Sequence, residues 1–363
     1  MAAVALGLPR SQPRSGEAAF AGMPTSGPML DRFGRAATDL RISLTDRCNL
    51  RCTYCMPEEG LQWLPDHDLL SAEEIVRLVR IAVTALQVAE VRFTGGEPLL
   101  RKELPEILRA VSALRPRPEL SLTTNALGLR QKAQLLADSG LDRLNVSLDA
   151  ADPATYAEST RRNRFGDVIA GLAAAKAAGL RPIKVNAVLT RRGTKPWRQV
   201  AAELLDLCLA EGYELRFIEQ MPLDAERSWS RDEMVTADEI LDALSRNHSL
   251  SLDPAPRGSA PASRWLVDGG PASVGVIASV TKPFCADCDR TRITADGQVR
   301  NCLFAAEETD LRALLRAQEL QGADLDEALA LRWRQAMWTK RAGHGMDEPW
   351  FQQPERPMSA IGG

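Results

Sequence analysis

The 363-residue sequence lacks the long apolar runs that a membrane-spanning segment requires. Its most apolar stretch, residues 169–180, is shorter than the roughly 18 residues of a spanning helix, and Lys176 interrupts it, so it predicts a buried helix. The formal net charge is only −3, which gives no general attraction for nucleic acid but allows a local basic pocket. We therefore expect neither a membrane nor a nucleic acid as a partner.

Histidine is scarce, and the phosphate-binding glycine loop of many nucleotide-binding proteins is absent. The three histidines, His67, His248 and His344, lie too far along the chain from most cysteines to complete an obvious zinc site. No Gly-x4-Gly-Lys-Ser/Thr motif occurs, so any bound triphosphate would need individual cationic side chains.

The first 30 residues contain Pro, Gly, Ser and Ala without apolar periodicity, which predicts a disordered N-terminal tail. No secretory apolar core is visible there. Arg10 and Arg14, with the single acid Glu17, leave an organellar transit peptide as the alternative. We expect a cytoplasmic protein, with an organellar matrix as the second choice.

Between residues 39 and 222, short apolar strands alternate with helical segments. The expected strands are 40–44, 90–93, 120–123, 143–148, 183–189 and 215–218, and the expected helices are 71–87, 101–114, 129–139, 165–178 and 196–211. This alternation implies parallel strands joined by helical crossovers. We interpret it as an α/β fold, an incomplete (open) TIM-like barrel of about six βα units. A doubly wound sheet also fits.

The pattern changes after residue 235, which predicts a smaller α+β region. A helix at 236–246, a loop at 253–263, strands at 274–280 and 293–303 and a helical stretch at 311–338 are expected there. The predicted organisation is therefore a tail at 1–30, the partial barrel at 31–235, the C-terminal region at 236–345 and a tail at 346–363.

Six of the seven cysteines fall into two groups of three, and the seventh, Cys208, lies in an apolar segment that predicts a core position. The first group is Cys48-x3-Cys52-x2-Cys55, directly after the first expected strand. Three thiolates on one loop can hold three irons of a 4Fe–4S cluster and leave the fourth iron open for a substrate. Zinc and free thiols are the alternatives at this point.

The second group is Cys285-x2-Cys288-x13-Cys302, which again has three thiols and an apparent vacancy. By itself this spacing is as compatible with zinc as with a cluster. The C-terminal strand ends expected to surround the first group contribute Gly95-Gly96-Glu97, Thr123-Thr124-Asn125, Ser147-Leu148-Asp149 and Glu219-Gln220-Met221. A single pocket could gather all of them.

The first cysteine motif with Tyr54, followed by Gly95-Gly96-Glu97-Pro98, resembles the radical S-adenosylmethionine (SAM) superfamily. Further segments narrow the resemblance: Thr45-Asp46-Arg47-Cys48, Arg216-Phe217-Ile218-Glu219, the residues around the second cysteine group, and Ile361-Gly362-Gly363 at the end. Together they resemble the GTP 3′,8-cyclase (MoaA) family of molybdenum cofactor biosynthesis from about residue 31 to the end. Ala126 departs from the pattern, since the family commonly has glycine there.

The resemblance implies two 4Fe–4S clusters, one that cleaves SAM on Cys48, Cys52 and Cys55, and an auxiliary one on Cys285, Cys288 and Cys302. It implies SAM contacts at Tyr54, Gly96, Ser147 and Met221. It implies GTP contacts at Arg41, Arg92, Thr123, Lys184, Arg290, Thr291 and Arg292. It also implies that Gly362 and Gly363 form a catalytic tail.

The activity implied is that of a lyase in which a 5′-deoxyadenosyl radical removes hydrogen from C3′ of GTP and the ribose radical attacks C8 of guanine. The product would be (8S)-3′,8-cyclo-7,8-dihydroguanosine 5′-triphosphate, an early intermediate of molybdopterin. The implied partners are GTP, SAM, an electron donor and the downstream cyclic pyranopterin monophosphate synthase, for a monomer or homodimer. Two alternatives remain: another radical SAM enzyme with an auxiliary cluster, such as a peptide-modifying maturase, or a zinc-stabilised scaffold protein.

Overall fold

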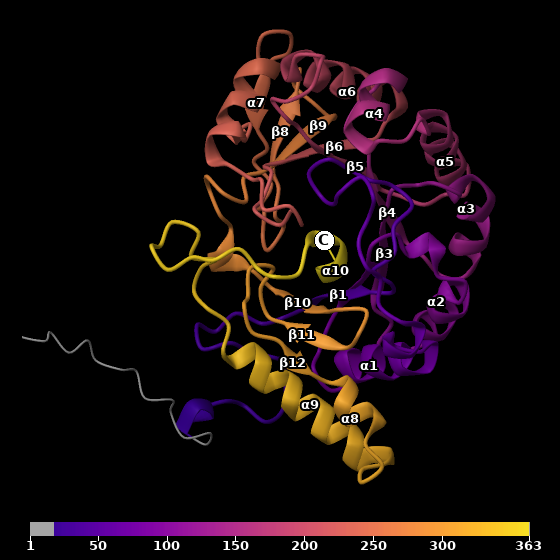
Figure 1. The fold of residues 1–363 in the computed structure, drawn as a ribbon, viewed down its shortest axis with the longest axis vertical. Coiled ribbons are helices and arrows are strands. Elements are labelled where there is room, and N and C mark those ends of the chain that lie inside the picture. The colour runs from indigo at the N-terminus through magenta and orange to yellow at the C-terminus, as the bar shows by residue number, and fades with distance from the viewer. Residues whose placement is uncertain (1–17, 363) are drawn as a thin grey trace, which may run out of the picture.

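A curved sheet of twelve strands forms the centre of the molecule (Figure 1). The computed structural model describes residues 18–362. The strands are β1 (Asp39–Ser43), β2 (Glu90–Thr94), β3 (Glu119–Thr124), β4 (Arg143–Ser147), β5 (Ile183–Val188), β6 (Glu214–Ile218), β7 (Leu250–Leu252), β8 (Ser263–Val267), β9 (Ser273–Ile277), β10 (Arg290–Ile293), β11 (Gln298–Arg300) and β12 (Thr309–Asp310). Their order is β12-β11-β10-β1-β2-β3-β4-β5-β6-β9-β8-β7.

The eight central strands of this order, from β10 to β9, run parallel, and the outer pairs at both ends are antiparallel. The sheet is therefore mixed but mostly parallel. The parallel part places the carboxyl ends of its strands, and the loops that follow them, at one edge of the sheet.

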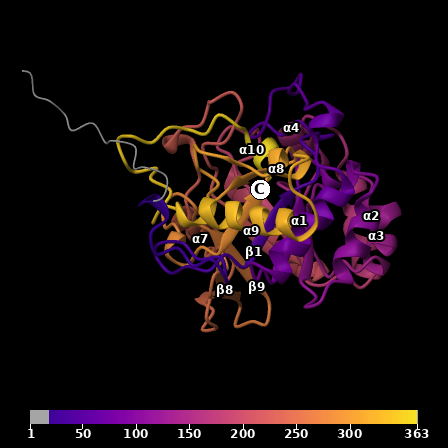
Figure 2. The same cartoon turned by 90° about the horizontal axis from the view of Figure 1, so that it is seen from below.

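Helices cover the outer side of the sheet (Figure 1). They are α1 (Ala72–Thr84), α2 (Leu104–Ser112), α3 (Leu129–Asp138), α4 (Pro153–Thr160), α5 (Phe165–Ala177), α6 (Trp197–Glu211), α7 (Ala237–Leu244), α8 (Arg312–Arg316) and α9 (Gly322–Trp338). The short helix α10 (Met358–Ile361) lies on the inner side instead (Figure 1). Figure 2 shows α9 beside α1, and the two helices are in contact. Capping boxes start two of these helices, with Ser71 and Glu74 at α1 and Thr236 and Glu239 at α7.

Strand residues alternate between an apolar outer face and a polar inner face. Leu40 and Ile42 of β1, and Val91 and Phe93 of β2, are fully buried in the core that the helices cover. The residues between them, such as Arg41, point to the opposite face, because successive side chains on a strand leave opposite sides of the sheet. The inner face of a mostly parallel sheet is thus unusually rich in charge, which a functional cavity would explain.

The six predicted strand–helix units are confirmed, with ends that differ by up to a few residues. The prediction missed α4, although its signal is present in the sequence. Asp152 caps this helix by accepting hydrogen bonds from the backbone N–H groups of Ala154 and Thr155, and Pro153 occupies its first position.

The C-terminal region differs from the prediction in several elements. The strands β7, β8 and β12 were not predicted. The strand expected at 293–303 is a hairpin of β10 and β11, which turns at Gly297. The helical stretch expected at 311–338 is divided into α8 and α9, because the backbone is extended at Ala317, which ends α8, and at Gln321, which precedes α9. The strands β9 and β10 join opposite ends of the β1–β6 series, so one sheet crosses the predicted domain boundary at residue 235.

Of the predicted N-terminal tail, residues 1–17 lie outside the described residues. The end of this segment differs from the prediction. Met29 is fully buried, and Arg334 of α9 donates hydrogen bonds to the carbonyl oxygens of Gly27 and Pro28. Among the described helices, none has the length and apolar character to cross a membrane.

Candidate active site

A cavity of about 310 Å³ lies where the inner face of the sheet meets the loops after the parallel strands. It brings together fifteen of the residues predicted from the sequence. These are Arg41, Cys48, Cys52, Tyr54, Cys55, Arg92, Gly96, Thr123, Ser147, Met221, Cys285, Cys288, Arg290, Arg292 and Cys302. Two cysteine groups that are more than 200 residues apart in the sequence therefore face one space, because β10 pairs directly with β1.

Of the other four predicted residues, the three that the structure describes do not line the cavity. Lys184 does not line the cavity; its ammonium lies 3.9 Å from the carboxylate of Glu214. Burial and the nearby Arg216 lower the pKa of Lys184 to about 8. Thr291 points to the helix side of β10, where its hydroxyl accepts a hydrogen bond from Trp333 Nε1 at 2.9 Å. Gly362 lies against β1 and β2, and Gly363 is outside the described residues.

The first cysteine loop is held by the glycine pair after β2. The backbone N–H of Gly96 donates to the carbonyl oxygen of Thr45, and that of Glu97 to the carbonyl oxygen of Arg47, both at 2.7 Å. A Cβ atom at Gly96 would lie 2.6 Å from the carbonyl carbon of Arg47 and would overlap the carbonyl oxygens of Arg47 and Asp46. The glycine pair thus allows two backbones to meet, in addition to any approach to a ligand on the cavity side.

Glu97 lies in the loop after β2 and forms hydrogen bonds to the loops after β1 and β3. Its carboxylate accepts hydrogen bonds from the Thr124 hydroxyl at 2.6 Å, the Asn125 N–H at 2.7 Å and the Leu99 N–H at 2.9 Å. Burial raises the pKa of Glu97 to about 7, although these donors favour the charged form. The Asn125 side-chain amide in turn lies 3.8 Å from the sulfur of Cys48.

Tyr54 is fixed by a carboxylate at the end of β4. Its hydroxyl donates to Asp149 Oδ2 at 3.0 Å, while Asp149 Oδ1 accepts the N–H of Val188 at 2.9 Å. Burial raises the pKa of Asp149 to about 6. The aromatic ring before the third cysteine therefore has a defined position at the cavity wall.

The second cysteine group lies beside two cations. Cys285 and Cys288 bracket a short 3-10 turn, and Cys302 follows β11. The ammonium of Lys340, a buried residue, lies 3.3 Å from the sulfur of Cys288, and a guanidinium nitrogen of Arg290 lies 3.6 Å from it. Burial opposes ionisation, but Lys340 and Arg290 lower the pKa of Cys288 to about 7.

This donor set fits two iron–sulfur clusters. Each group offers three free thiols to the same cavity, and N–H donors point at two of the sulfurs. Within residues 18–362, no three His, Cys, Asp or Glu side chains lie close enough together to hold one metal ion. In a 4Fe–4S cluster each thiolate binds a different iron, so its ligands need not surround one point.

Arginines from three neighbouring strands form a layer beside the cysteines. Arg292 of β10, Arg41 of β1 and Arg92 of β2 are aligned across the sheet, and Arg290 lies two residues before Arg292. Burial and the neighbouring Arg92 lower the pKa of Arg41 to about 9, and burial with Arg41 lowers that of Arg292 to about 9.

The positive charge of this layer is not balanced within the described residues. Asp39 is the acid nearest to it, 3.7 Å from both Arg41 and Arg290. The Nε atoms of Arg41, Arg290 and Arg292 are buried without a hydrogen-bond partner in the described part of the chain. Buried guanidinium groups with unsatisfied N–H donors and only one nearby carboxylate are costly, so the layer is suited to an anionic ligand.

The C-terminal tail reaches the inside of the fold, where Figure 1 shows the end of the chain near β1. Met358 and Ser359 of α10 line the cavity, and the backbone N–H of Met358 donates to the Leu223 carbonyl oxygen at 2.9 Å. Gly362 has a φ of +81°, and a Cβ atom there would overlap Ser43 and lie 2.9 Å from Thr94 Cγ2. The backbone and the available space both require glycine at this position.

Several cavity residues were not predicted from the sequence. They include Asn145, Asn186, Arg216, Phe304, His344 and Ser359. Asn145, Asn186 and Arg216 occupy inner-face positions of β4, β5 and β6, so the alternation of polar and apolar residues along these strands was the available signal. Phe304 and His344 carry no comparable sequence pattern.

Ala126, which stands where the resembling family commonly has glycine, adopts a φ of +63°. This left-handed conformation costs an alanine roughly 1–2 kcal/mol relative to glycine. The loop keeps its shape because Thr124 Oγ1 accepts the N–H of Ala126 and Asn125 Oδ1 accepts that of Leu127.

Comparisons with known proteins agree with this geometry. The family described as the radical SAM superfamily matches residues 42–205, and the family described as Molybdenum Cofactor Synthesis C matches residues 213–346. The solved structure of Streptococcus suis SuiB bound to S-adenosylmethionine has a TM-score of 0.56 with 16% identity, covering 87% of this chain and 69% of that chain. This likeness shows a radical SAM fold.

Two relatives match over nearly the whole chain. A GTP 3′,8-cyclase of Mycobacterium sp. (strain KMS) is 62% identical over 343 residues, covering 94% of this chain and 96% of the relative. A GTP 3′,8-cyclase of Mycobacterium marinum (strain ATCC BAA-535 / M) is 59% identical over 368 residues, covering 100% of both chains. The chain therefore belongs to the GTP 3′,8-cyclase family of the radical SAM superfamily.

Proposed function

We propose that this chain uses SAM to convert GTP into (8S)-3′,8-cyclo-7,8-dihydroguanosine 5′-triphosphate, an early step of molybdenum cofactor biosynthesis. Membership of the radical SAM superfamily implies an iron–sulfur cluster and SAM. One observation carries the assignment of the substrate: a layer of buried and half-buried arginines shares one cavity with both cysteine groups. A polyanion such as a triphosphate satisfies that layer, whereas a neutral peptide would leave its charge unpaired.

In this proposal, Cys48, Cys52 and Cys55 hold one 4Fe–4S cluster, and Cys285, Cys288 and Cys302 hold the second. When bound, such clusters supply electron transfer and, at an iron without a protein ligand, a coordination site for a substrate. The protein contributes the position of the thiolates. Backbone contacts of Gly96 and Glu97 fix the first loop, and Lys340 with Arg290 compensates the charge at Cys288.

The arginine layer would bind the triphosphate and so decide where the ribose and guanine lie. Arg41, Arg92, Arg290 and Arg292 point into the cavity from three adjacent strands, and Arg216 approaches from β6. Thr123 supplies a hydroxyl between these two groups of cations. Holding C3′ and C8 in contact replaces a search through many conformers, an effect that can contribute roughly 7–11 kcal/mol to lowering a barrier.

SAM would occupy the side of the cavity that the first cysteine loop forms. Tyr54, Gly96, Ser147 and Met221 all line this space. The hydrogen bond from Tyr54 to Asp149 and the Glu97 contacts keep these groups in place without a ligand. Gly362, and with it Gly363, would complete the pocket from the C-terminal tail.

The remaining sequence-based expectations are part of this proposal. They are an incomplete barrel, which the curved sheet of Figure 1 supports, an electron donor, and cyclic pyranopterin monophosphate synthase as the next enzyme. A cytoplasmic location and a monomer or homodimer are likewise predictions. The division into a barrel at 31–235 and a C-terminal region at 236–345 also stays a prediction.

The test is an anaerobic assay of reconstituted protein with SAM, GTP and dithionite. We expect about eight irons per chain, release of 5′-deoxyadenosine and a cyclised nucleotide detected by mass spectrometry. Replacing Cys48, Cys52 and Cys55 by alanine should leave about four irons and abolish SAM cleavage. Cys208→Ala is the matched control, because Cys208 is buried in the core outside the cavity. Stoichiometric zinc, or cleavage of SAM without any cyclised GTP, would contradict the proposal.

A further inference from the structure

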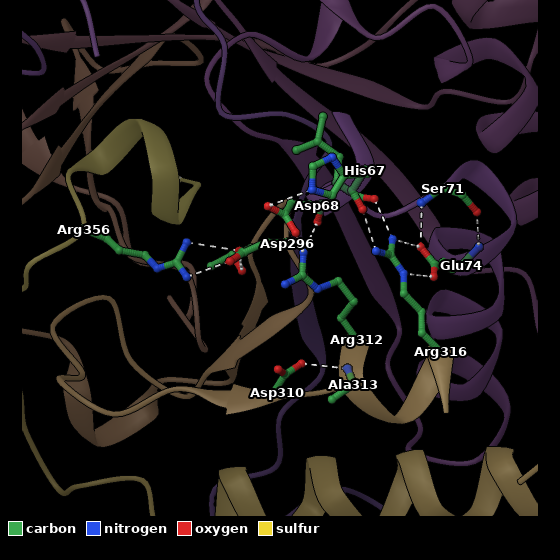
Figure 3. A network of polar contacts seen from close by, with 12 residues as sticks. His67, Asp68, Ser71, Glu74, Asp296, Asp310, Arg312, Ala313, Arg316 and Arg356 are labelled. Atoms are coloured by element: carbon green, nitrogen blue, oxygen red, sulfur yellow. Dashed lines mark hydrogen bonds and ion pairs between the residues drawn. The ribbon is translucent and has the colours of Figure 1, made fainter. Parts of the chain in front are cut away.

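One arginine of the C-terminal tail pairs with two carboxylates of the body of the protein. The Nη1 and Nη2 atoms of Arg356 donate to Oδ1 and Oδ2 of Asp296 at 3.1 and 2.8 Å, and its Nε donates to Glu308 Oε2 at 3.0 Å. Figure 3 shows the Arg356 side chain directed at Asp296. Bidentate guanidinium–carboxylate pairs are among the strongest polar contacts in proteins.

Both carboxylates belong to the hairpin that carries Cys302. Asp296 lies in the β10–β11 turn and also accepts the hydroxyl of Thr294 at 2.5 Å. Glu308 lies just before β12, and the buried Arg300 of β11 donates to it. Cys302 stands between Arg300 and Glu308 in the sequence, so Arg356 bonds directly to the framework of the second cysteine group.

The same turn is fixed from its other side. The carbonyl oxygen of Ala295 accepts the N–H of Leu70 at 2.8 Å. Close by, Arg312 of α8 donates to Asp68, and Arg316 donates to Glu74 (Figure 3). The turn is therefore a rigid support rather than a loop that could follow the tail if the tail moved.

The backbone on either side of Arg356 is restricted, so fixing Arg356 also fixes the segment that leads toward the cavity. Pro354 and Pro357 flank it closely, and proline restricts both its own backbone and that of the residue before it. Pro357 is the N-cap of α10, a single helical turn that ends next to Gly362. Five residues thus separate Arg356 from Gly362, the glycine that contacts Ser43 and Thr94.

We propose that Arg356 is a positioning residue: by pairing with Asp296 and Glu308 it holds the C-terminal tail against the second cysteine hairpin and so places Gly362 beside Thr94, a residue of the cavity wall. This inference rests on the proposed function, in which the tail aligns the substrates for cyclisation. Arginine suits this role, because its planar fork reaches two carboxylates at once, whereas the lysine ammonium acts as a single point charge.

A second ion pair of the tail provides a matched control. Arg231 donates to Asp347 at 2.6 Å near the start of the tail, but these side chains are 50% and 65% exposed. The side chains of Arg356 and Asp296 are only 26% and 10% exposed. Exposed ion pairs contribute little to stability, so we expect that removing Arg231 leaves the tail in place. The Arg231 variant therefore shows whether the loss of any tail contact, rather than the loss of Arg356, displaces the tail.

The experiment compares Arg356→Ala, Arg356→Lys and Arg231→Ala as reconstituted holoenzymes. We expect amide hydrogen exchange at residues 358–362 to become about tenfold faster in Arg356→Ala, corresponding to about 1.4 kcal/mol. Cyclised product per 5′-deoxyadenosine should fall about tenfold as well, with iron content and GTP affinity unchanged. Arg356→Lys should give intermediate values, and Arg231→Ala should stay within about twofold of the wild type.

Wild-type exchange and product ratio in Arg356→Ala would overturn the inference, and so would equal losses in Arg231→Ala. If Arg356→Ala loses iron, then Arg356→Lys and Asp296→Asn decide the question, since both retain a polar partner at the turn. Wild-type protein that makes no cyclised product would contradict the proposed function. The exchange rates would still establish or refute Arg356 as the tail's anchor.

Discussion

Replacing Gly96 by alanine tests whether backbone contact with the glycine pair holds the first cysteine loop. The new Cβ atom would lie 2.6 Å from the carbonyl carbon of Arg47, whereas carbon atoms in contact normally stay about 3.5 Å or more apart. The loop would have to move by about 1 Å, and the 2.7 Å hydrogen bonds to Thr45 and Arg47 could not survive that movement.

The expected cost follows from these two losses. Overpacking typically costs about 1–3 kcal/mol, and each lost hydrogen bond about 1 kcal/mol, so Gly96→Ala should destabilise the native loop by roughly 3–5 kcal/mol. Because Cys48 immediately follows Arg47, the displacement should also disrupt the first cluster. We expect about four irons per chain instead of about eight, retained iron at the second group, and no SAM cleavage.

Anaerobic iron analysis and 5′-deoxyadenosine release measure this effect, with Gly166→Ala in α5 as the control. Gly166 has no atom within 4 Å of an added Cβ and no positive φ, so this substitution should be neutral or slightly stabilising. A Gly96→Ala protein with full iron content and normal SAM cleavage would refute the reasoning, since it would show that the loop can move without losing its ligands.

Three further perturbations address the other parts of the site. The pKa of Glu97 is about 7 in the folded protein and near 4.5 in the unfolded chain, so between these pH values the folded protein binds one proton that the unfolded chain has lost. The free energy of unfolding should therefore fall by about 3 kcal/mol as the pH rises from 4.5 to 7, and then level off. Anaerobic urea denaturation should show that Glu97→Gln removes this part of the slope, and an unchanged slope would contradict it. Arg41→Ala should weaken GTP binding at least tenfold in equilibrium dialysis while leaving slow SAM cleavage, whereas Arg162→Ala, outside the cavity, should not. Lys340→Met should lower the reduction potential of the second cluster by about 60 mV in an EPR-monitored titration, because it removes a cation and an N–H donor from Cys288, while exposed Lys282→Met should have no effect.

The strand–helix series and the cysteine groups could be predicted from the sequence because their signals are local. Ser71 and Thr236 cap the starts of helices with regular apolar spacing, and three cysteines within eight residues can be recognised without a fold. The register of β10 against β1 could not be predicted, because pairing between residues some 250 positions apart leaves no local signal.

The same limit explains the site residues that sequence reasoning placed less well. Thr291 lies between two cavity arginines, yet the alternation of the strand turns it toward Trp333. Arg216 was used only as part of a segment that carries the family resemblance, and its pairing with Asn186 places it at the cavity. Arg356 stands in a proline-containing tail, and its importance depends on Asp296, sixty residues earlier.

The position of β1 between β10 and β2 also affects how the protein is made. A nascent chain that has just released β1 from the ribosome lacks the strand that covers one of its edges, since β10 begins only at Arg290. At translation rates of 5–20 residues per second, this edge stays unpaired for roughly 10–50 s. During that time the exposed edge of β1 offers its backbone to any extended chain nearby, so a chaperone that shields it should raise the yield of folded protein.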